Sequence, residues 1–287
     1  MKRENTMKTI GYYNGTIAPL EELMIPANDR SNYYADGVYD AAYGRNYKIF
    51  ALDEHVDRFF KSLSMIRIEP NLTKAELKVL LQSLVDKLDS DEFCLYWHMT
   101  RGTALRGHAF PKDTSPNLLV TVRPHKLLDT ASCRYKLWSV EDNRYYFCNI
   151  KTINLLPNVL ANQTAKDHGC DEAIFIRNGY VSEGSHSNMA ILKDGKFITA
   201  PLTNLILPGV TRLHTIQICR EKGIPVEERA FSFAELMDAD EVIMMASSVQ
   251  GVAISHINGT PVGGKDTKTY ETIRAAYREK YLSETEA

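Results

Sequence analysis

At 287 residues the chain exceeds the size at which one hydrophobic core keeps growing, so two domains are expected. Apolar residues make up 44% and charged residues 24%, a composition typical of globular proteins and not of disordered or fibrous ones. The formal net charge of −2 gives no overall field that would attract nucleic acid or an anionic membrane.

The chain carries no visible signal for export or membrane insertion. It has no run of about 18 uncharged apolar residues, and the polar start from Met1 to Lys8 lacks the apolar core of a secretion signal. Five cysteines are widely spaced without a C-x-x-C pair, which argues against a disulfide framework or a zinc site. A cytoplasmic location is therefore expected. Because Met7 lies just before the first strand-like segment, residues 1–6 are either a disordered extension or the result of an upstream start.

Residues 1–122 are expected to form a small α+β domain, because strand-like and helical patterns alternate along them. Asn14-Gly15 is a dipeptide favoured in tight type I′ hairpins, and a Thr73-x-x-Glu76 capping box precedes one helical pattern. The expected elements are a hairpin over 10–17, helices over 56–66 and 77–88, and strands over 93–99 and 118–122.

A polar stretch that begins at Arg123-Pro-His-Lys breaks the pattern, and we place an interdomain linker at 123–130. Residues 131–287 are expected to form a larger α/β domain. Asn178-Gly179 and Asp194-Gly195 are typical of hairpin turns between apolar runs. The expected elements are strands near 135–140, 172–176 and 188–192, and helices near 158–168, 211–222, 233–237 (behind a Ser232-x-x-Glu235 box) and 270–281.

Lys151 is the first candidate for chemistry. It stands at a polar-to-apolar boundary just before an expected helix, in the segment Cys148-Asn-Ile-Lys-Thr-Ile-Asn-Leu-Leu-Pro-Asn-Val-Leu-Ala. Desolvation lowers the pKa of an ammonium group, and a lysine that attacks a carbonyl requires such a lowered pKa. The alternative is a lysine whose charged end extends to solvent.

A polar cluster between two strand-like runs, Val181-Ser-Glu-Gly-Ser-His-Ser-Asn188, is either a surface turn or part of a site. In a site, Glu183 would have a definite task. A carboxylate beside a pyridine nitrogen keeps that nitrogen protonated, so that the ring can accept electrons in carbanion chemistry.

The segment Leu207-Pro-Gly-Val-Thr-Arg leads from a loop into the helix expected near Thr211. Free backbone N–H groups and the positive end of the helix dipole at such a start would hold a phosphate dianion, and Thr211 would add a hydroxyl group. The alternative is an ordinary helix cap without a ligand.

Together these three segments resemble those of the fold-type IV pyridoxal-phosphate aminotransferases, in the same order and spacing. Asp36-Gly-Val-Tyr39 and Glu54-His-x-Asp-Arg58 also match the small domain of that family, so the similarity extends over nearly the whole chain. The resemblance implies an α/β (α+β) fold of two domains. It also implies an enzyme that moves an amino group between an amino acid and a 2-oxo acid, with pyridoxal 5′-phosphate as its cofactor.

The resemblance further implies roles for individual residues. Lys151 and Glu183 would be catalytic: Lys151 binds the cofactor covalently and moves a proton, and Glu183 pairs with the pyridine nitrogen. Asn188 and Leu207 would hold the ring, Leu207 by packing on its face. The phosphate group would be bound by Arg58, Val210, Thr211 and Ser247.

Arg106 and His108 give the strongest clue to the substrate. Arginine binds a carboxylate through two charge-assisted hydrogen bonds, and a histidine two residues away on a loop can join it. This arginine-x-histidine pair, together with Tyr39, resembles the group that binds the α-carboxylate in the D-amino acid aminotransferases. The resemblance therefore favours a D-amino acid as substrate.

Three further positions bear on the substrate side. Arg144 matches an active-site arginine of the D-specific enzymes and is interpreted as a hydrogen-bonding support near the cofactor or Glu183. Ala41 stands where a larger β-branched residue is usual, which would enlarge the substrate pocket. His186 replaces a small serine of the family motif. Aromatic candidates to line the pocket are Tyr33, Tyr34, Trp97 and Tyr146.

Alternative functions share the same cofactor residues. An L-branched-chain amino acid aminotransferase would orient the carboxylate differently, and an aminodeoxychorismate lyase would eliminate pyruvate. A binding protein without turnover is a non-enzymatic alternative, which retention of the expected catalytic residues argues against. The resemblance also implies a homodimer, in which the loop with Arg106 and His108 completes the active site of the neighbouring subunit.

Overall fold

The computed structural model describes residues 6–286, so the question about the leading residues lies almost wholly outside the described part. The chain divides into two compact units, and each is described by itself. Unit 1 contains the chain up to Leu127, residues 150–154 and the end from Leu282, whereas unit 2 contains residues 128–149 and 155–281. The first division lies within the expected linker at 123–130.

The other divisions differ from the expected second domain at 131–287, because a short central segment and the C-terminal residues belong to unit 1. The central segment Ile150–Asn154 pairs with the residues near Tyr39 in unit 1. The Tyr39 N–H group donates to the Lys151 carbonyl over 2.8 Å. Such pairing between residues far apart in the chain has no local sequence signal, so the sequence analysis did not group this segment with the first domain.

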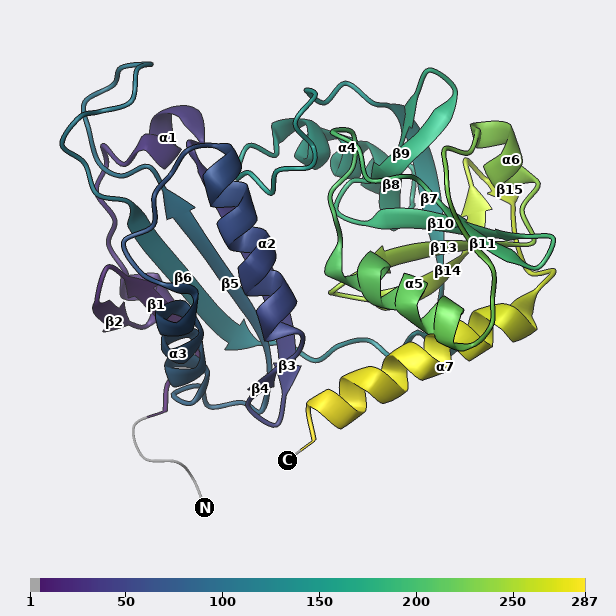
Figure 1. Cartoon of the computed structure of the whole chain (residues 1–287), viewed down its shortest axis with the longest axis horizontal. Coiled ribbons are helices and arrows are strands. Elements are labelled where there is room, and N and C mark those ends of the chain that lie inside the picture. Colours follow the sequence, from purple (N-terminus) through teal and green to yellow (C-terminus); the bar gives the residue numbers. More distant parts are fainter. Residues whose placement is uncertain (1–5, 287) are drawn as a thin grey trace. The chain divides into compact units, whose positions relative to one another are not determined.

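Unit 1 contains a six-stranded sheet in the order β2-β1-β6-β5-β3-β4, with all neighbours antiparallel. Its elements are β1 (Ile10–Tyr13), β2 (Thr16–Ala18), the short helix η1 (Leu20–Glu22), α1 (Arg30–Tyr34), β3 (Gly37–Arg45), β4 (Lys48–Ile49), α2 (Leu52–Met65), α3 (Lys74–Val85), β5 (Glu92–Thr100) and β6 (Asn117–Pro124). Helices α2 and α3 cover one face of this sheet (Figure 1).

Local patterns account for most of unit 1. Val56, Phe59 and Leu63 of α2 are fully buried at the predicted helical spacing, and they join the core of the sheet. The predicted capping box is confirmed, since the Thr73 hydroxyl accepts from the Glu76 N–H group. β3 was not predicted. Its sequence contains glycine, alanine and aspartate, which have low strand propensity, and its pairing with β5 along all nine residues stabilises it instead.

Unit 2 contains a nine-stranded mixed sheet in the order β12-β11-β10-β13-β14-β7-β8-β9, with β15 beside β14. Its elements are the short helix η2 (Thr130–Ser132), β7 (Arg134–Glu141), α4 (Leu156–Asp167), β8 (Glu172–Arg177), β9 (Tyr180–Gly184), β10 (Asn188–Lys193), β11 (Lys196–Thr199), α5 (Val210–Glu221), β12 (Val226–Glu228), α6 (Phe233–Met237), β13 (Glu241–Ala246), β14 (Gln250–Ile257), β15 (Thr260–Pro261) and α7 (Thr267–Glu284), whose last residues fall in unit 1.

Two hairpin turns of unit 2 lie where the sequence predicts them. Asn178-Gly179 joins β8 to β9 and Asp194-Gly195 joins β10 to β11, and the asparagine and aspartate have φ of 52° and 50°. These left-handed conformations are those of type I′ hairpin turns, so both predictions are confirmed. β13 was not predicted because a continuous buried apolar run has no period that separates strand from helix. Among residues 6–286, no helix combines the length and apolar character needed to cross a membrane.

Candidate active site

Lys151 lies in unit 1 beside the start of β3. Its carbonyl accepts from Tyr39, and an antiparallel bridge joins the next residue, Thr152, to Val38. The Lys151 N–H group donates to the Ser62 hydroxyl of α2 over 3.3 Å. The Lys151 ammonium nitrogen lies 4.2 Å from the centroid of the Tyr39 ring, a distance at which a cation is attracted to an aromatic face. The half-buried lysine is thus held on both sides by backbone contacts.

Tyr39 is itself fixed by an aromatic row. Its ring stacks on Tyr96 of β5 with centroids 5.5 Å apart, and the Tyr96 hydroxyl lies 3.0 Å from Nδ1 of His98. Burial lowers the pKa of His98 to about 4, so this imidazole is neutral at neutral pH. Ala41 follows Tyr39 on the same face of β3 and lies opposite Tyr96. Ala41 is half-buried there, and its predicted effect on the size of the substrate pocket stays a prediction.

Arg58 reaches a buried aspartate on the opposite face of β3. Asp40 is fully buried, and it accepts from Arg58 Nε over 2.9 Å and Nη2 over 2.6 Å, and contacts His55 Nδ1 at 2.8 Å. Burial alone would raise the pKa of Asp40, but the Arg58 charge and the His55 contact hold it well below its usual range. The predicted phosphate ligand Arg58 is thus preoriented by Asp40, which the sequence analysis missed.

Arg106 and His108 meet in unit 1 at one aromatic ring. Both residues are exposed on the loop that follows β5. The Arg106 guanidinium carbon lies 5.5 Å from the centroid of the Tyr34 ring, and the His108 ring centroid lies 5.3 Å from it. The structure therefore brings together the two residues predicted to bind a carboxylate, and it assigns Tyr34 as their common support.

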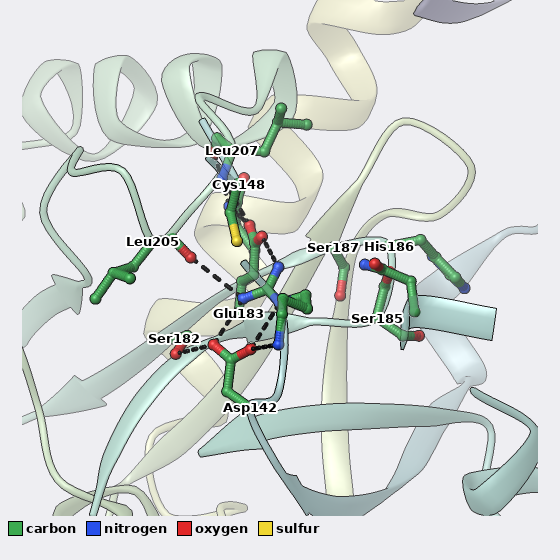
Figure 2. A network of polar contacts seen from close by, with 12 residues as sticks. Asp142, Cys148, Ser182, Glu183, Ser185, His186, Ser187, Leu205 and Leu207 are labelled. Carbon is green, nitrogen blue, oxygen red and sulfur yellow. Dashed lines mark hydrogen bonds and ion pairs between the residues drawn. The ribbon is translucent and has the colours of Figure 1, made fainter. Parts of the chain in front are cut away.

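Glu183 is the centre of a buried network in unit 2. One carboxylate oxygen accepts from Arg144 Nη1, and the other accepts from the Asn188 side-chain amide over 3.0 Å and the Leu207 N–H group over 2.9 Å. The Asn188 amide also donates to the Leu207 carbonyl over 3.0 Å. Four residues predicted from three segments of the chain therefore share one network, of which Figure 2 labels Glu183 and Leu207.

Asp142 supports this network through Arg144 and was missed by the sequence analysis. It accepts from Arg144 Nε over 2.9 Å and Nη2 over 3.0 Å, and also from Ser182 over 2.9 Å (Figure 2). Burial raises the pKa of Asp142, but hydrogen bonds from Arg144 and Arg177 outweigh it and lower the pKa to about 2. Each guanidinium nitrogen of Arg144 donates to Asp142, Glu183 or the Leu205 carbonyl, so Arg144 supports Glu183.

The environment of Glu183 suits a cationic partner. Burial raises the pKa of the Glu183 carboxyl to about 7, although the Arg144 charge and the Leu207 N–H group act to lower it. Burial therefore favours the neutral form of this carboxyl more than is usual for a glutamate. A protonated pyridine nitrogen would supply the positive charge that keeps it ionised, so the residues present fit the pyridine ring of the expected cofactor.

The raised pKa predicts a particular pH dependence of stability. Folded Glu183 binds a proton more tightly than the unfolded side chain does. Its stabilising contribution is therefore complete below the usual glutamate pKa of about 4.3 and is lost as the pH rises through about 7. Denaturant unfolding of the cofactor-free protein from pH 5 to 8 should show a loss of up to about 3 kcal/mol relative to Glu183→Gln. Parallel pH profiles for the two proteins would contradict the raised pKa.

The start of α5 has the features of an anion site. Helix α5 begins at Val210, and no side chain caps it. The Thr211 hydroxyl is buried and has no hydrogen-bond partner within the described part of the chain. A Cβ atom at Gly209 would lie 2.1 Å from the Asn188 side-chain oxygen, so only glycine fits this approach. Uncapped N–H groups beside an unused hydroxyl match the requirements of a phosphate group.

Ser247 lies half-buried in the turn between β13 and β14. In residues 6–286 it takes part in none of the hydrogen bonds around Glu183. Its predicted contact with a phosphate group therefore depends on the resemblance alone.

Comparison with known proteins adds an independent observation. Residues 37–257 match the family model for amino-transferase class IV. The D-alanine aminotransferase of Bacillus licheniformis is 34% identical over 275 residues, which cover 95% of this chain and 97% of that protein. The branched-chain amino acid aminotransferase of Escherichia coli has a TM-score of 0.86 at 23% identity, with 96% of each chain covered. The corresponding enzyme from T.th., solved with pyridoxamine 5′-phosphate, has a TM-score of 0.84 at 22% identity, with 97% of this chain and 98% of that chain covered.

Proposed function

The chain belongs to the class IV aminotransferases, and we propose that within this pyridoxal-phosphate-dependent family it transfers the amino group of D-amino acids to 2-oxo acids. The observation that carries the D preference is the 34% identity to a D-alanine aminotransferase over 95% of the chain. The pairing of Arg106 with His108 on Tyr34 supports it. The fold is shared with branched-chain aminotransferases, so the fold by itself does not favour either substrate.

We propose that Lys151 and Glu183 carry the chemistry. When bound, pyridoxal 5′-phosphate supplies the carbon that receives the amino group and a ring that accepts the electron pair left by the departing α-hydrogen. Lys151 would hold the cofactor through its side-chain nitrogen and would accept the proton of the substrate α-carbon. Glu183 holds a proton on the pyridine nitrogen, and its Arg144 and Asn188 contacts fix its orientation.

The remaining cofactor residues are proposed to bind and orient. Leu207 contributes its side chain to one face of the ring, and Asn188 holds the backbone of Leu207 in place. Arg58 supplies a positive charge for the phosphate group, with its direction set by Asp40. The other proposed phosphate contacts are the Val210 N–H group and the Thr211 and Ser247 hydroxyls.

On the substrate side, Arg106 and His108 are proposed to bind the α-carboxylate together with Tyr39, with their loop completing the active site of the neighbouring subunit. Ala41 is proposed to leave room for the substrate side chain. We also propose that the enzyme is a homodimer, as its resemblance to the family implies. Sedimentation analysis of the purified protein checks this, since a fully active monomer would contradict it.

Arg106→Ala tests the substrate assignment. A hydrogen bond to a charged group contributes about 1.5–3 kcal/mol, so KM for D-alanine is expected to rise by about 10- to 100-fold. The amount of bound cofactor should remain unchanged, because Arg106 is not assigned to the cofactor. Steady-state kinetics with D-alanine and a 2-oxo acid measure the change. Arg123→Ala, which removes an exposed arginine at the end of β6, is the control and should leave KM unchanged. An unaltered KM in Arg106→Ala would contradict the carboxylate role.

Product analysis separates the alternatives. Amino transfer from L-leucine but not from D-alanine would identify a branched-chain enzyme. Release of pyruvate from aminodeoxychorismate without an amino acceptor would identify a lyase.

A further inference from the structure

The loop over residues 101–110 follows β5 and is anchored at its base by residues 28–30. The Arg30 N–H group donates to the Gly102 carbonyl over 3.0 Å, and an antiparallel bridge joins the preceding residue to Thr103. The backbone around Arg30 therefore fixes the direction in which the loop leaves the sheet.

The Arg30 side chain reaches a second point of the same loop. Arg30 is only 3% exposed, and its Nη1 atom donates to the Gly107 carbonyl over 2.7 Å. Its Nε atom donates to Asp36 over 2.8 Å, so the buried guanidinium group has a counter-charge. Gly107 is the residue between Arg106 and His108. A buried cation thus holds the peptide unit that separates the two proposed carboxylate ligands.

The three basic side chains share one aromatic ring. The guanidinium carbon of Arg30 lies 4.9 Å from the centroid of the Tyr34 ring, and that of Arg106 lies 5.5 Å from it. His108 contacts the same ring. Asp36 pairs with both Arg30 and Arg101, whereas Arg106 forms no ion pair among residues 6–286, so its charge can bind an anion.

Little else restrains the two ligands. Within the described residues, neither the Arg106 nor the His108 side chain makes a hydrogen bond. Their orientation therefore depends on the loop backbone and on the Tyr34 ring, and Arg30 contacts both.

We propose that Arg30 is a positioning residue for substrate binding, which orients Arg106 and His108 through the Gly107 carbonyl and the Tyr34 ring. The proposal rests on the proposed function, because it requires Arg106 and His108 to bind the substrate carboxylate. A misplaced Arg106 guanidinium group would lose much of its two-pronged contact with the carboxylate. Removal of Arg30 should therefore weaken substrate binding, although Arg30 itself does not contact the substrate.

Arg30→Met removes the donors and keeps a long side chain. KM for D-alanine is expected to rise by about 10-fold with kcat within about threefold, since binding and not chemistry is disturbed. The same change is then made in an Arg106→Ala/His108→Ala protein. In that protein Arg30→Met should change KM by less than about twofold, because the two side chains that Arg30 positions are absent.

Arg134→Met is a matched control from unit 2. Arg134 donates to the buried Glu241 over 3.0 and 3.1 Å, and its guanidinium carbon lies 5.9 Å from the Tyr270 ring centroid. The control therefore breaks the same kind of contacts at residues with no proposed role in the site. Its thermal midpoint should fall while KM for D-alanine stays unchanged.

The outcomes separate the two proposals. A normal KM in Arg30→Met beside a raised KM in Arg106→Ala overturns the positioning role and leaves the proposed function standing. A normal KM in Arg106→Ala overturns the proposed function itself. An equal rise from Arg30→Met with and without Arg106 and His108 shows general loosening, which also overturns the positioning role.

If Arg30→Met does not fold, Arg30→Lys provides the same comparison. Lysine keeps a positive charge beside Asp36 but lacks the guanidinium group, which donates to Asp36 and the Gly107 carbonyl at once. A KM for D-alanine between those of the wild type and Arg106→Ala supports the proposal, and a wild-type KM overturns it.

Discussion

Lys151→Ala is expected to lower kcat with D-alanine by about 10³-fold or more, because it removes both the covalent attachment of the cofactor and the group that moves the α-proton. Turnover is measured at saturating pyridoxal 5′-phosphate, so that weak cofactor binding does not limit the rate. Borohydride reduction followed by peptide mass spectrometry supplies a second readout. In the wild-type protein the cofactor should be found on the peptide that contains Lys151.

Lys166→Ala is the control for this change. Lys166 is exposed near the end of α4, and its side chain donates to the Asp171 carbonyl. The control should keep both the covalent attachment and the rate. Near-normal turnover in Lys151→Ala, or attachment of the cofactor to another lysine, would contradict the proposed role of Lys151.

Glu183→Gln is expected to lower kcat by about 10²- to 10³-fold, as expected when one preorganised electrostatic partner is lost from a buried site. The amide keeps the shape of the side chain and can still accept from the Leu207 N–H group. It carries no charge, however, so it does not hold a proton on the pyridine nitrogen, and the ring becomes a poorer electron acceptor. Steady-state rates and the absorbance spectrum of the bound cofactor measure both effects.

Glu241→Gln provides a matched control for Glu183→Gln. Glu241 on β13 is also fully buried and also paired with an arginine, Arg134. Its replacement should lower stability and leave kcat near the wild-type value. Equal rates in wild type and Glu183→Gln would contradict the pairing of Glu183 with the pyridine nitrogen.

The sequence predicted those parts of the structure that depend on local chemistry. The hairpin turns at Asn14-Gly15, Asn178-Gly179 and Asp194-Gly195 and the capping box at Thr73 are properties of neighbouring residues, and each was found where expected. The mixed α and β fold also followed from these alternating patterns. By contrast, β3 and β13 lack a clear period, and pairing with distant strands determines them.

In the site, too, residues in local motifs were predicted and residues that depend on distant partners were missed. Glu183, Asn188 and Leu207 were predicted from motifs, and the structure places them in one network. Asp40 and Asp142 were missed, because Arg58 and Arg177, which pair with them, lie far away in the sequence. The burial of Asp40 gave no signal in the sequence, because β3 itself was not predicted. By contrast, the Asp142-x-Arg144 spacing at the end of β7 was an available signal.

The central claim is tested most directly by half-reaction spectroscopy of the purified protein loaded with pyridoxal 5′-phosphate. D-Alanine and L-leucine are added separately, without a 2-oxo acid, and the absorbance of the cofactor is followed. The account predicts that D-alanine converts the bound cofactor to its pyridoxamine form and that L-leucine does not. Conversion by L-leucine alone would contradict the D preference, and conversion by neither would contradict the assignment as a D-amino acid aminotransferase.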